Sequence, residues 1–366
     1  MNTADPPRFG VEEEFLVVDP ATRVTAPQAE KVIEHARQAL GNRVSGELTK
    51  LQVETRTDPC SSVAQVHSQL VEARTALAAS AVDLGLRVVA TGTPVLSGSV
   101  PAPITEGARQ DRGNATYRSL HDDQAICAVH VHVEMPDRTR ALQVSNHLRP
   151  HLPVLLALTA NSPHWDGRDT GYAGWRTMIW QRWPVAGPPP HFTSVEHYDE
   201  TVMTLLSSGV LVDTGTVFWD MRPSLRHPTL EIRVADVPIT AWESALYAAV
   251  IRALVMSVGP AIDRGEDAPF VRPEFMRAAY WRAARDGLDG DGIDVRTGTV
   301  VPMAAQVTTL VDGLRPILRD NGDHDLVDGW LEELLTIGGS AARQRAAAAE
   351  RGDLADVVDH LIAHLT

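Results

Sequence analysis

The sequence has little cysteine and little lysine, and each shortage excludes a class of protein. Only Cys60 and Cys127 are cysteines, and no Cys/His zinc spacing is present, so we expect free thiols in a reducing compartment. Among 33 basic residues, only Lys31 and Lys50 are lysines. No GxxxxGKS/T sequence exists, which excludes a P-loop. Any nucleotide phosphates must therefore be held by arginine, backbone N–H groups and metal ions.

Long apolar runs and an excess of positive charge are also absent. We find no run of about eighteen apolar residues and no apolar signal region, so we expect a cytoplasmic protein without a membrane span. The formal net charge of −14 argues against general nucleic-acid binding. The 366 residues are 44% hydrophobic, which is enough for one large domain with a sizeable core.

The segment FGVEEEFLVV, residues 9–18, is the most unusual stretch that is present. Its β-branched, aromatic and aliphatic residues predict a strand. Side chains alternate along a strand, so Glu12 and Glu14 share one face and Glu13 takes the other. Two like charges on one face repel unless a cation or a proton lies between them. The pattern suggests a divalent metal, with a solvated edge strand as the alternative, and we expect Glu13 to be structural, paired with an arginine or a helix N-terminus.

The rest of the chain mixes strands and helices without a regular β-α-β order. Apolar spacing, turn residues and capping boxes predict the following elements: helices over 28–40, 63–84, 139–160 (with a break near Pro150 and Pro153), 195–208 and 240–258; strands over 44–56, 86–93, 125–135, 216–224 and 228–236; long loops over 93–115 and 161–192; and mostly helix from 258 to 366. We expect an α+β fold with a mostly antiparallel sheet and helices packed on one face.

Each predicted strand has one apolar and one polar face, and the polar faces should line one concave surface. That surface carries Glu12, Glu14, Glu54, His130, His132, Asp220, Arg222, Glu231 and Arg233. Taken singly, these residues have ordinary explanations, such as a Glu54–Arg56 or Glu231–Arg233 ion pair, and Trp175 and Trp180 are typical packing residues. Together, carboxylates with imidazoles suit Mg²⁺ or Mn²⁺, and such ions beside several arginines are what phosphoryl transfer from ATP requires.

Five segments in this order resemble a known family. They are FGVEEEFLVVDP, ELTKLQVET, VHVHVEM, ANSPHWDG with TGYAGWR, and FWDMRPSLRHPTLEIRVAD. The chain resembles the carboxylate-amine ligase family, also called glutamate–cysteine ligase type 2, of the glutamine synthetase superfamily. The resemblance covers residue 8 to about residue 260. It implies a glutamine-synthetase-like catalytic domain over 1–366, with a sheet-bearing core at 8–260 and a helical C-terminal part at 261–366.

The resemblance also implies roles for individual residues. Metal ligands would be Glu12, Glu14, Glu54, His130 and Glu231, and ATP would bind with Mg²⁺ or Mn²⁺. His132 would be a ligand or a phosphate contact, Arg233 would face the transferred phosphate, and Arg222 and Arg176 would bind phosphate or a substrate carboxylate. Asp220 and Glu134 are candidates for the base that takes the proton of the amine.

The implied reaction is an ATP-dependent ligation of a small-molecule carboxylate, glutamate-like, to an amine through an acyl phosphate. One departure is that Ala128 and Glu134 stand where the family usually has glycine around HVHV, which puts strict glutamate–cysteine ligase activity in doubt. A small-molecule kinase of the same superfamily and an inactive nucleotide-binding regulator are the alternatives. The sequence leaves open whether the protein is a homo-oligomer, and it does not disclose the amine.

Overall fold

An open seven-stranded sheet forms the centre of the computed structural model, which describes residues 6–98 and 101–366. The strand order is β10-β11-β5-β1-β3-β2, β4 also pairs with β1, and every pairing in this sheet is antiparallel. Its strands are β1 (Phe9–Val18), β2 (Val44–Gly46), β3 (Gln52–Arg56), β4 (Arg87–Val89), β5 (Ala128–Glu134), β10 (Met221–Pro223) and β11 (Thr229–Asp236). The glutamate-bearing β1 is thus the central strand, with neighbours on both sides, and not the edge strand of the alternative interpretation.

Three two-stranded pairs accompany the main sheet. They are β6 (His164–Trp165) with β7 (Arg168–Asp169), β8 (Ala186–Gly187) with β9 (Phe218–Trp219), and β12 (Asp291–Ile293) with β13 (Val300–Pro302). The helices are α1 (Ala29–Leu40), α2 (Val63–Asp83), α3 (Ala108–Tyr117), α4 (Arg138–Leu148), α5 (Leu152–Thr159), α6 (Trp175–Trp180), α7 (Val195–Ser207), α8 (Ala241–Ser257), α9 (Gly259–Asp263), α10 (Pro273–Asp286), α11 (Met303–Asp320), α12 (His324–Ile337), α13 (Ser340–Arg351) and α14 (Leu354–Ala363).

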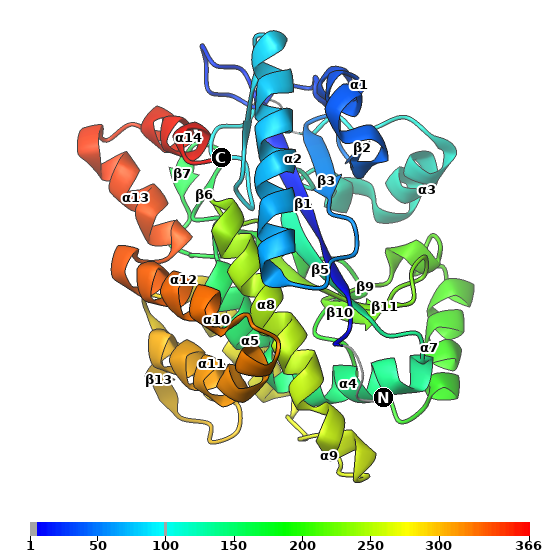
Figure 1. Cartoon of the computed structure of the whole chain (residues 1–366). Coiled ribbons are helices and arrows are strands. Elements are labelled where there is room, and N and C mark those ends of the chain that lie inside the picture. Colours follow the sequence, from blue (N-terminus) through cyan, green and yellow to red (C-terminus); the bar gives the residue numbers. More distant parts are fainter. Residues whose placement is uncertain (1–5, 99–100) are drawn as a thin grey trace.

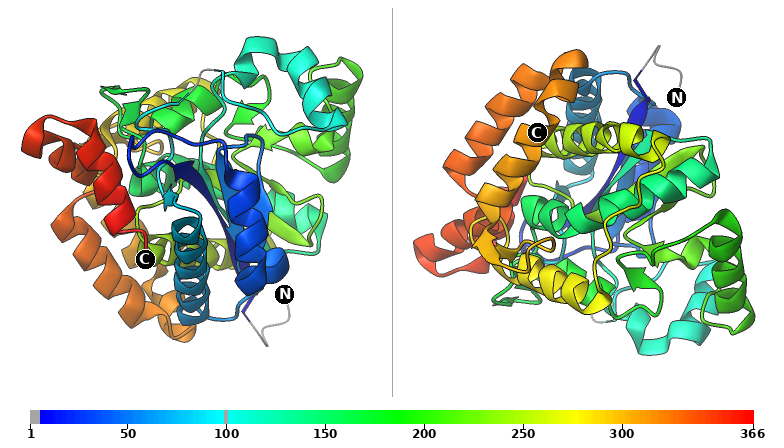
Figure 2. Two further views of the ribbon diagram at one scale, coloured as in Figure 1. Left: turned by 90° about the horizontal axis from the view of Figure 1, so that it is seen from above. Right: turned by 90° about the horizontal axis from the view of Figure 1, so that it is seen from below.

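The apolar face of the sheet packs on helices, as the alternation of side chains predicts. Val11, Val131 and Ile232 on neighbouring strands are buried in one cluster with residues of α2 and α8. Figure 1 shows α2 and α8 crossing this face, and Figure 2 shows helices on that side of the sheet when the molecule is turned. Burial of this face directs the opposite, polar face toward the candidate site.

Glu13 lies on the helix-covered face and is fully buried. Arg74 of α2 donates to its two carboxylate oxygens at 3.0 and 2.5 Å, and the Ser244 hydroxyl of α8 donates at 2.5 Å. A buried charge is tolerated only when it is paired and hydrogen-bonded. The expectation that Glu13 is structural and paired with an arginine is confirmed.

The C-terminal part is helical, as expected, and it shares its core with the rest of the chain. Met276, Tyr280 and Val307 belong to the same buried cluster as the residues of β5 and β11. Figure 1 shows α12 and α13, coloured orange, on one side of α8. The stretch Ala241–Asp263 is long and apolar enough, by composition, to cross a membrane, which the sequence analysis did not expect. Most of this stretch is buried inside the protein, and this accounts for its apolar sequence.

Local signals placed most elements well but failed at four points. The predicted loop 161–192 contains helix α6 and the short strands β6, β7 and β8, whose pairing partners local patterns do not indicate. Residues 44–56 form a hairpin of β2 and β3, not one strand. The predicted loop 93–115 contains most of α3, although residues 99 and 100 lie outside the described part. The predicted strand 216–224 is interrupted at Asp220, because β9 pairs with β8 before it and β10 pairs with β11 after it.

Candidate active site

The antiparallel register brings the predicted glutamates and histidines together on the polar face. Glu12 of β1 lies opposite His130 of β5, and Glu231 of β11 lies opposite His132. On the other side of β1, Glu14 faces Glu54 of β3. Opposite residues in an antiparallel pair have neighbouring side chains, so the site follows directly from the strand pairing.

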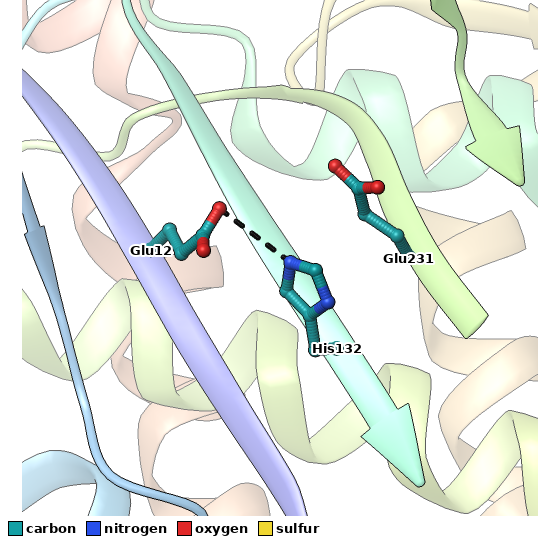
Figure 3. Close-up of side chains that lie close together, drawn as sticks. All are labelled: Glu12, His132 and Glu231. Atoms are coloured by element: carbon teal, nitrogen blue, oxygen red, sulfur yellow. Dashed lines mark ion pairs between the residues drawn. The ribbon is translucent and has the colours of Figure 1, made fainter. Parts of the chain in front are cut away.

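Glu12, His132 and Glu231 form a first group of metal-binding type. Each offers one ligand atom, and these atoms lie within 4.8 Å of one another. The three side chains come from three adjacent strands and point toward one another, and the dashed line in Figure 3 joins Glu12 to His132 Nε2, 3.5 Å apart. The other ring nitrogen of His132, Nδ1, lies 2.9 Å from the Thr229 hydroxyl, which orients the imidazole.

Two further groups continue the row along the sheet. Glu12, Glu54 and His130 form the second, and Glu14, Glu47 and Glu54 form the third, again with ligand atoms within 4.8 Å. Glu12 is shared by the first two groups and Glu54 by the last two. The predicted ligands therefore form a continuous row of three overlapping groups and not one isolated cluster.

The carboxylates of the third group are buried together at an electrostatic cost. Burial raises the pKa of Glu14 to about 7 and the pKa of Glu47 to about 7. Burial, followed by the neighbouring Glu47 charge, also raises the pKa of Glu54. Like charges this close are stabilised either by protons or by a cation. Oxygen-rich groups with one imidazole fit Mg²⁺ or Mn²⁺, so the donor set fits the predicted metal.

The first group is held in its charged form by its neighbours. Burial works against ionisation of Glu12, but contacts with His130 and His132 bring the pKa of Glu12 well below its usual value. Burial also opposes ionisation of Glu231, yet Arg233 and Arg222 hold the pKa of Glu231 far below its usual range. In the second group, burial and the Arg233 charge lower the pKa of His130 to about 4. His130 is therefore neutral near pH 7, as a metal-binding imidazole must be.

The three predicted arginines border this row. Arg222 Nε donates to Glu231 at 2.9 Å, and Arg233 also forms an ion pair with Glu231. Arg176, on α6, is buried, and its guanidinium lies 3.8 Å from the Asp236 carboxylate. The Nε atoms of Arg176 and Arg233 are buried without a hydrogen-bond partner in the described part of the chain. Unpaired buried donors are costly, and an anionic substrate group would satisfy them.

The backbone of Arg176 is fixed by a buried polar network. Its N–H donates to the Ser162 hydroxyl at 2.9 Å, and that hydroxyl donates to Asp236 at 2.6 Å. Asp236 also accepts from the Asn161 N–H at 2.9 Å. Gln344, on the C-terminal helix α13, donates to the Asn161 side chain at 2.7 Å. The helical C-terminal part is thereby connected to an arginine of the site.

A pocket of about 130 Å³ opens at the Glu14 end of the row. Its polar lining includes Glu14, Glu47, His130, Arg176 and Arg233. The lining also includes five aromatic rings, those of Tyr117, His121, Trp180, Trp183 and Phe218, together with aliphatic and amide side chains. A second cavity of about 620 Å³ borders the opposite end, where Glu12 and His132 lie with Arg8, Arg56 and Arg226. The row of acidic groups thus separates two cavities.

Neither candidate for the base borders the first pocket. Asp220 is buried with Tyr280 and Trp180 near its carboxylate, and burial raises the pKa of Asp220 to about 6. Glu134 is exposed, accepts from the Arg8 N–H at 3.2 Å and lines the second cavity. Both residues are therefore placed where they cannot contact a substrate in the first pocket directly.

The sequence analysis did not identify Glu47 or the aromatic residues that line the first pocket. Glu47 lies in the turn between β2 and β3, where strand alternation assigns no face, although it belongs to one of the motifs that resemble the family. Tyr117 and His121 come from a segment, between residues 115 and 125, to which no element was assigned. Trp180 carried a signal, since two arginines lie close to it in the sequence, but was interpreted as packing.

Comparisons with known proteins place the chain in one family. The model of the glutamate-cysteine ligase family 2 matches residues 8–360. A protein of Mycobacterium sp. (strain KMS), whose name assigns it provisionally to glutamate–cysteine ligase 2-2, is 47% identical over 96% of this chain and 97% of its own length. A similarly named protein of Nocardia farcinica (strain IFM 10152) is 43% identical over 98% of this chain and 93% of its own length.

Solved structures share the fold. A glutamate–cysteine ligase from Francisella tularensis, in complex with AMP, superposes with a TM-score of 0.74 at 11% identity, covering 99% of this chain and 88% of that chain. A bifunctional glutathione synthetase from Pasteurella multocida gives 0.69 at 14% identity, covering 98% of this chain and 52% of that one. These matches confirm the expected fold class of helices packed on a mostly antiparallel sheet, with a helical C-terminal part. From the family match over nearly its whole length, the chain belongs to glutamate-cysteine ligase family 2.

Proposed function

We propose that the protein is an ATP-dependent ligase that joins a glutamate-like carboxylic acid to an amine through an acyl phosphate. The observation that carries the proposal is the row of three overlapping acidic groups, with the buried Arg176 and the partly buried Arg222 and Arg233 beside it. Phosphoryl transfer needs charge neutralisation along the phosphate chain and arginine near the transferred group. The names of the relatives, and the AMP bound to the Francisella tularensis enzyme, support the substrate classes.

The metal ions would be held by the residues of the row. Glu12, His132 and Glu231 would hold one ion, Glu12, Glu54 and His130 a second, and Glu14, Glu47 and Glu54 a third. Bound Mg²⁺ or Mn²⁺ would neutralise phosphate and carboxylate oxygens. Glu12 and Glu54 would each serve two sites, so their positions set the spacing of the row.

The arginines would divide the remaining work. Arg233 lies beside both Glu231 and His130, which suits contact with the phosphate that is transferred. Arg176 lines the pocket with an unpaired Nε, which suits the substrate carboxylate. Arg222 bonds Glu231 and the carbonyl oxygens of Gly215 and Val217, so it would hold Glu231 in place rather than bind substrate. Fixed charges of this kind stabilise a transition state without reorganisation.

The proposal is tested by incubating the purified protein with ATP, Mg²⁺, L-glutamate and a panel of amines. We expect ADP, inorganic phosphate and a new γ-glutamyl amide by mass spectrometry. A phosphorylated small molecule without an amide would instead indicate a kinase. ATP binding without turnover, under conditions where Mg²⁺ raises the melting temperature, would indicate a regulator and contradict the ligase.

A further inference from the structure

A continuous series of aromatic rings leads away from the arginines in the first pocket. The guanidinium carbons of Arg176 and Arg233 lie 5.6 and 6.0 Å from the Trp180 ring centre. Trp180 contacts Phe218 with ring centres 4.9 Å apart, and Phe218 contacts Trp183 at 5.0 Å. The lining of the pocket therefore changes along its length. Carboxylates of the candidate metal groups lie at one end, arginines follow, and aromatic rings lie at the other end, which we call the aromatic end.

The aromatic end continues through Tyr117 and His121, whose ring centres lie 4.5 and 5.2 Å from that of Trp183. All of these rings line the pocket. The polar atoms of the outer rings are directed to the protein. Trp183 Nε1 donates to Gln124 at 2.8 Å, the Tyr117 hydroxyl donates to the Val210 carbonyl at 3.1 Å, and His121 Nδ1 lies 2.6 Å from Asn114. These three outer rings therefore offer a ligand chiefly their apolar ring surface.

The arginine at the aromatic end already has an ion-pair partner. Arg109 lines the pocket there, and its guanidinium donates to Asp213 at 2.8 and 3.3 Å. Burial and the Arg109 hydrogen bond act in opposite directions on Asp213, and the hydrogen bond, the larger effect, lowers the pKa of Asp213. Arg176 and Arg233 lie at the other end, beside the acidic row. Among the described residues that line the aromatic end, no arginine is left to bind a second carboxylate.

We propose that the amine substrate carries an apolar, aromatic tail and no carboxylate of its own, so that an arylalkylamine is used in preference to cysteine. This inference rests on the proposed ligase function and names its acceptor. The acid would lie beside the metal row, with the amine tail against Trp183, Phe218 and Tyr117. The amine nitrogen forms a C–N bond with the acyl carbon, the C–O bond to phosphate breaks, phosphate leaves with the electron pair, and the ammonium proton passes to solvent.

The test compares 2-phenylethylamine with L-phenylalanine, which adds only a carboxylate, and with L-cysteine. Each is assayed with ATP, Mg²⁺ and L-glutamate by the amide formed. We expect kcat/KM for 2-phenylethylamine to exceed both others by at least about tenfold, the discrimination that one or two apolar contacts provide. Equal or better use of L-cysteine would overturn the inference, and equal use of L-phenylalanine would overturn its claim about the carboxylate.

Hydroxylamine separates this inference from the ligase function itself. It is small enough to trap an acyl phosphate as a hydroxamate without filling the aromatic end. Hydroxamate formation without preference for 2-phenylethylamine would leave the ligase intact and overturn the proposed acceptor. Absence of both hydroxamate and ADP would refute the ligase, and the acceptor with it.

A variant tests whether the aromatic end causes the preference. In Phe218→Ala, the ratio of kcat/KM for 2-phenylethylamine to that for hydroxylamine should fall at least about tenfold, because only the larger amine reaches this ring. Phe275→Ala, at an exposed position on α10, is the matched control and should leave the ratio unchanged. An unchanged ratio in Phe218→Ala would place the amine elsewhere.

Discussion

Glu54 connects two of the three candidate metal groups through a single carboxylate. We predict that Glu54→Gln abolishes turnover, because an amide is neutral and cannot serve two cations as a carboxylate does. The fold should remain intact, because the nearest ion-pair partner of the buried Glu54 carboxylate in the described part of the chain is Arg56, at 3.6 Å. Turnover is measured by ADP release, and folding by circular dichroism and melting temperature.

The matched control is Glu106→Gln, whose side chain is largely exposed and pairs with Lys50. It should keep wild-type turnover. Mg²⁺ should raise the melting temperature of this control but have a much smaller effect on Glu54→Gln. Wild-type turnover in Glu54→Gln would refute the metal assignment.

Asp220 provides a pH-dependent prediction. Burial raises its pKa from 3.8 to about 6, so the folded state binds the proton more tightly than the unfolded state. Its contribution to stability is therefore lost as pH rises from about 4 to about 6, by roughly 3 kcal/mol at most. Asp220→Asn removes this titration.

Urea unfolding in the presence of EDTA checks this prediction. Between about pH 4 and pH 7, the free energy of unfolding of the wild type should fall relative to that of Asp220→Asn. Parallel pH profiles for the two proteins would show that the Asp220 carboxyl is not held in its neutral form by burial.

For single residues, the sequence predicted correctly those side chains whose strand face follows from the alternation along a strand. Glu12, Glu14, Glu54, His130, His132 and Glu231 all lie where regular strands direct them, because the strand period is two. Arg233 also reaches the site, although the pairing of β11 with β5 is irregular between Ile232 and Ala235. Glu47 lies in a turn and Asp220 at a strand interruption, and no period applies at either position. Their surroundings depend on tertiary contacts that local patterns do not encode.

Among the elements, strand β1 has glutamates with different roles on its two faces. Glu13 is fully buried with Arg74, and removing one partner leaves an uncompensated buried charge. We predict that Arg74→Leu lowers the free energy of unfolding by about 3–5 kcal/mol, measured by urea denaturation. The exposed pair of Arg138 with Asp199 supplies the control, and Arg138→Leu should cost at most about 1 kcal/mol.

A cost for Arg74→Leu no larger than that of the control would mean that the Glu13 charge is stabilised by other groups.

The predictions of helices and strands succeeded where the local sequence signals were complete. Thr240 and Glu243 form the predicted capping box at the start of α8, and Ser62 caps α2. They failed for short strands, because the pairing of β8 with β9 depends on residues far apart in the sequence.

In the molecule as a whole, the C-terminal helices contribute to the site through Gln344. This side chain is fully buried and donates to Asn161 and Thr91. We predict that Gln344→Leu costs about 1–3 kcal/mol of stability, because it leaves these partners unpaired. It should also raise KM for the acid, since Asn161 supports Asp236 and thereby Arg176.

Steady-state kinetics and urea unfolding test this coupling. Gln38→Leu, at an exposed position on α1, is the control for the change of side chain. A loss of stability with an unchanged KM would limit Gln344 to a structural role.

The sequence analysis could not predict the contact between Gln344 and Asn161, because these residues are 183 positions apart. That 1–366 is a single catalytic domain stays a prediction.

The acyl phosphate is the centre of the proposed reaction, and oxygen transfer tests it most directly. L-Glutamate labelled with ¹⁸O in its γ-carboxylate is incubated with the protein, ATP, Mg²⁺ and an accepted amine, and the released phosphate is analysed by mass spectrometry. If the carboxylate is phosphorylated before the amine attacks, each phosphate formed with the amide carries one labelled oxygen. Unlabelled phosphate accompanying amide formation would contradict the proposed reaction.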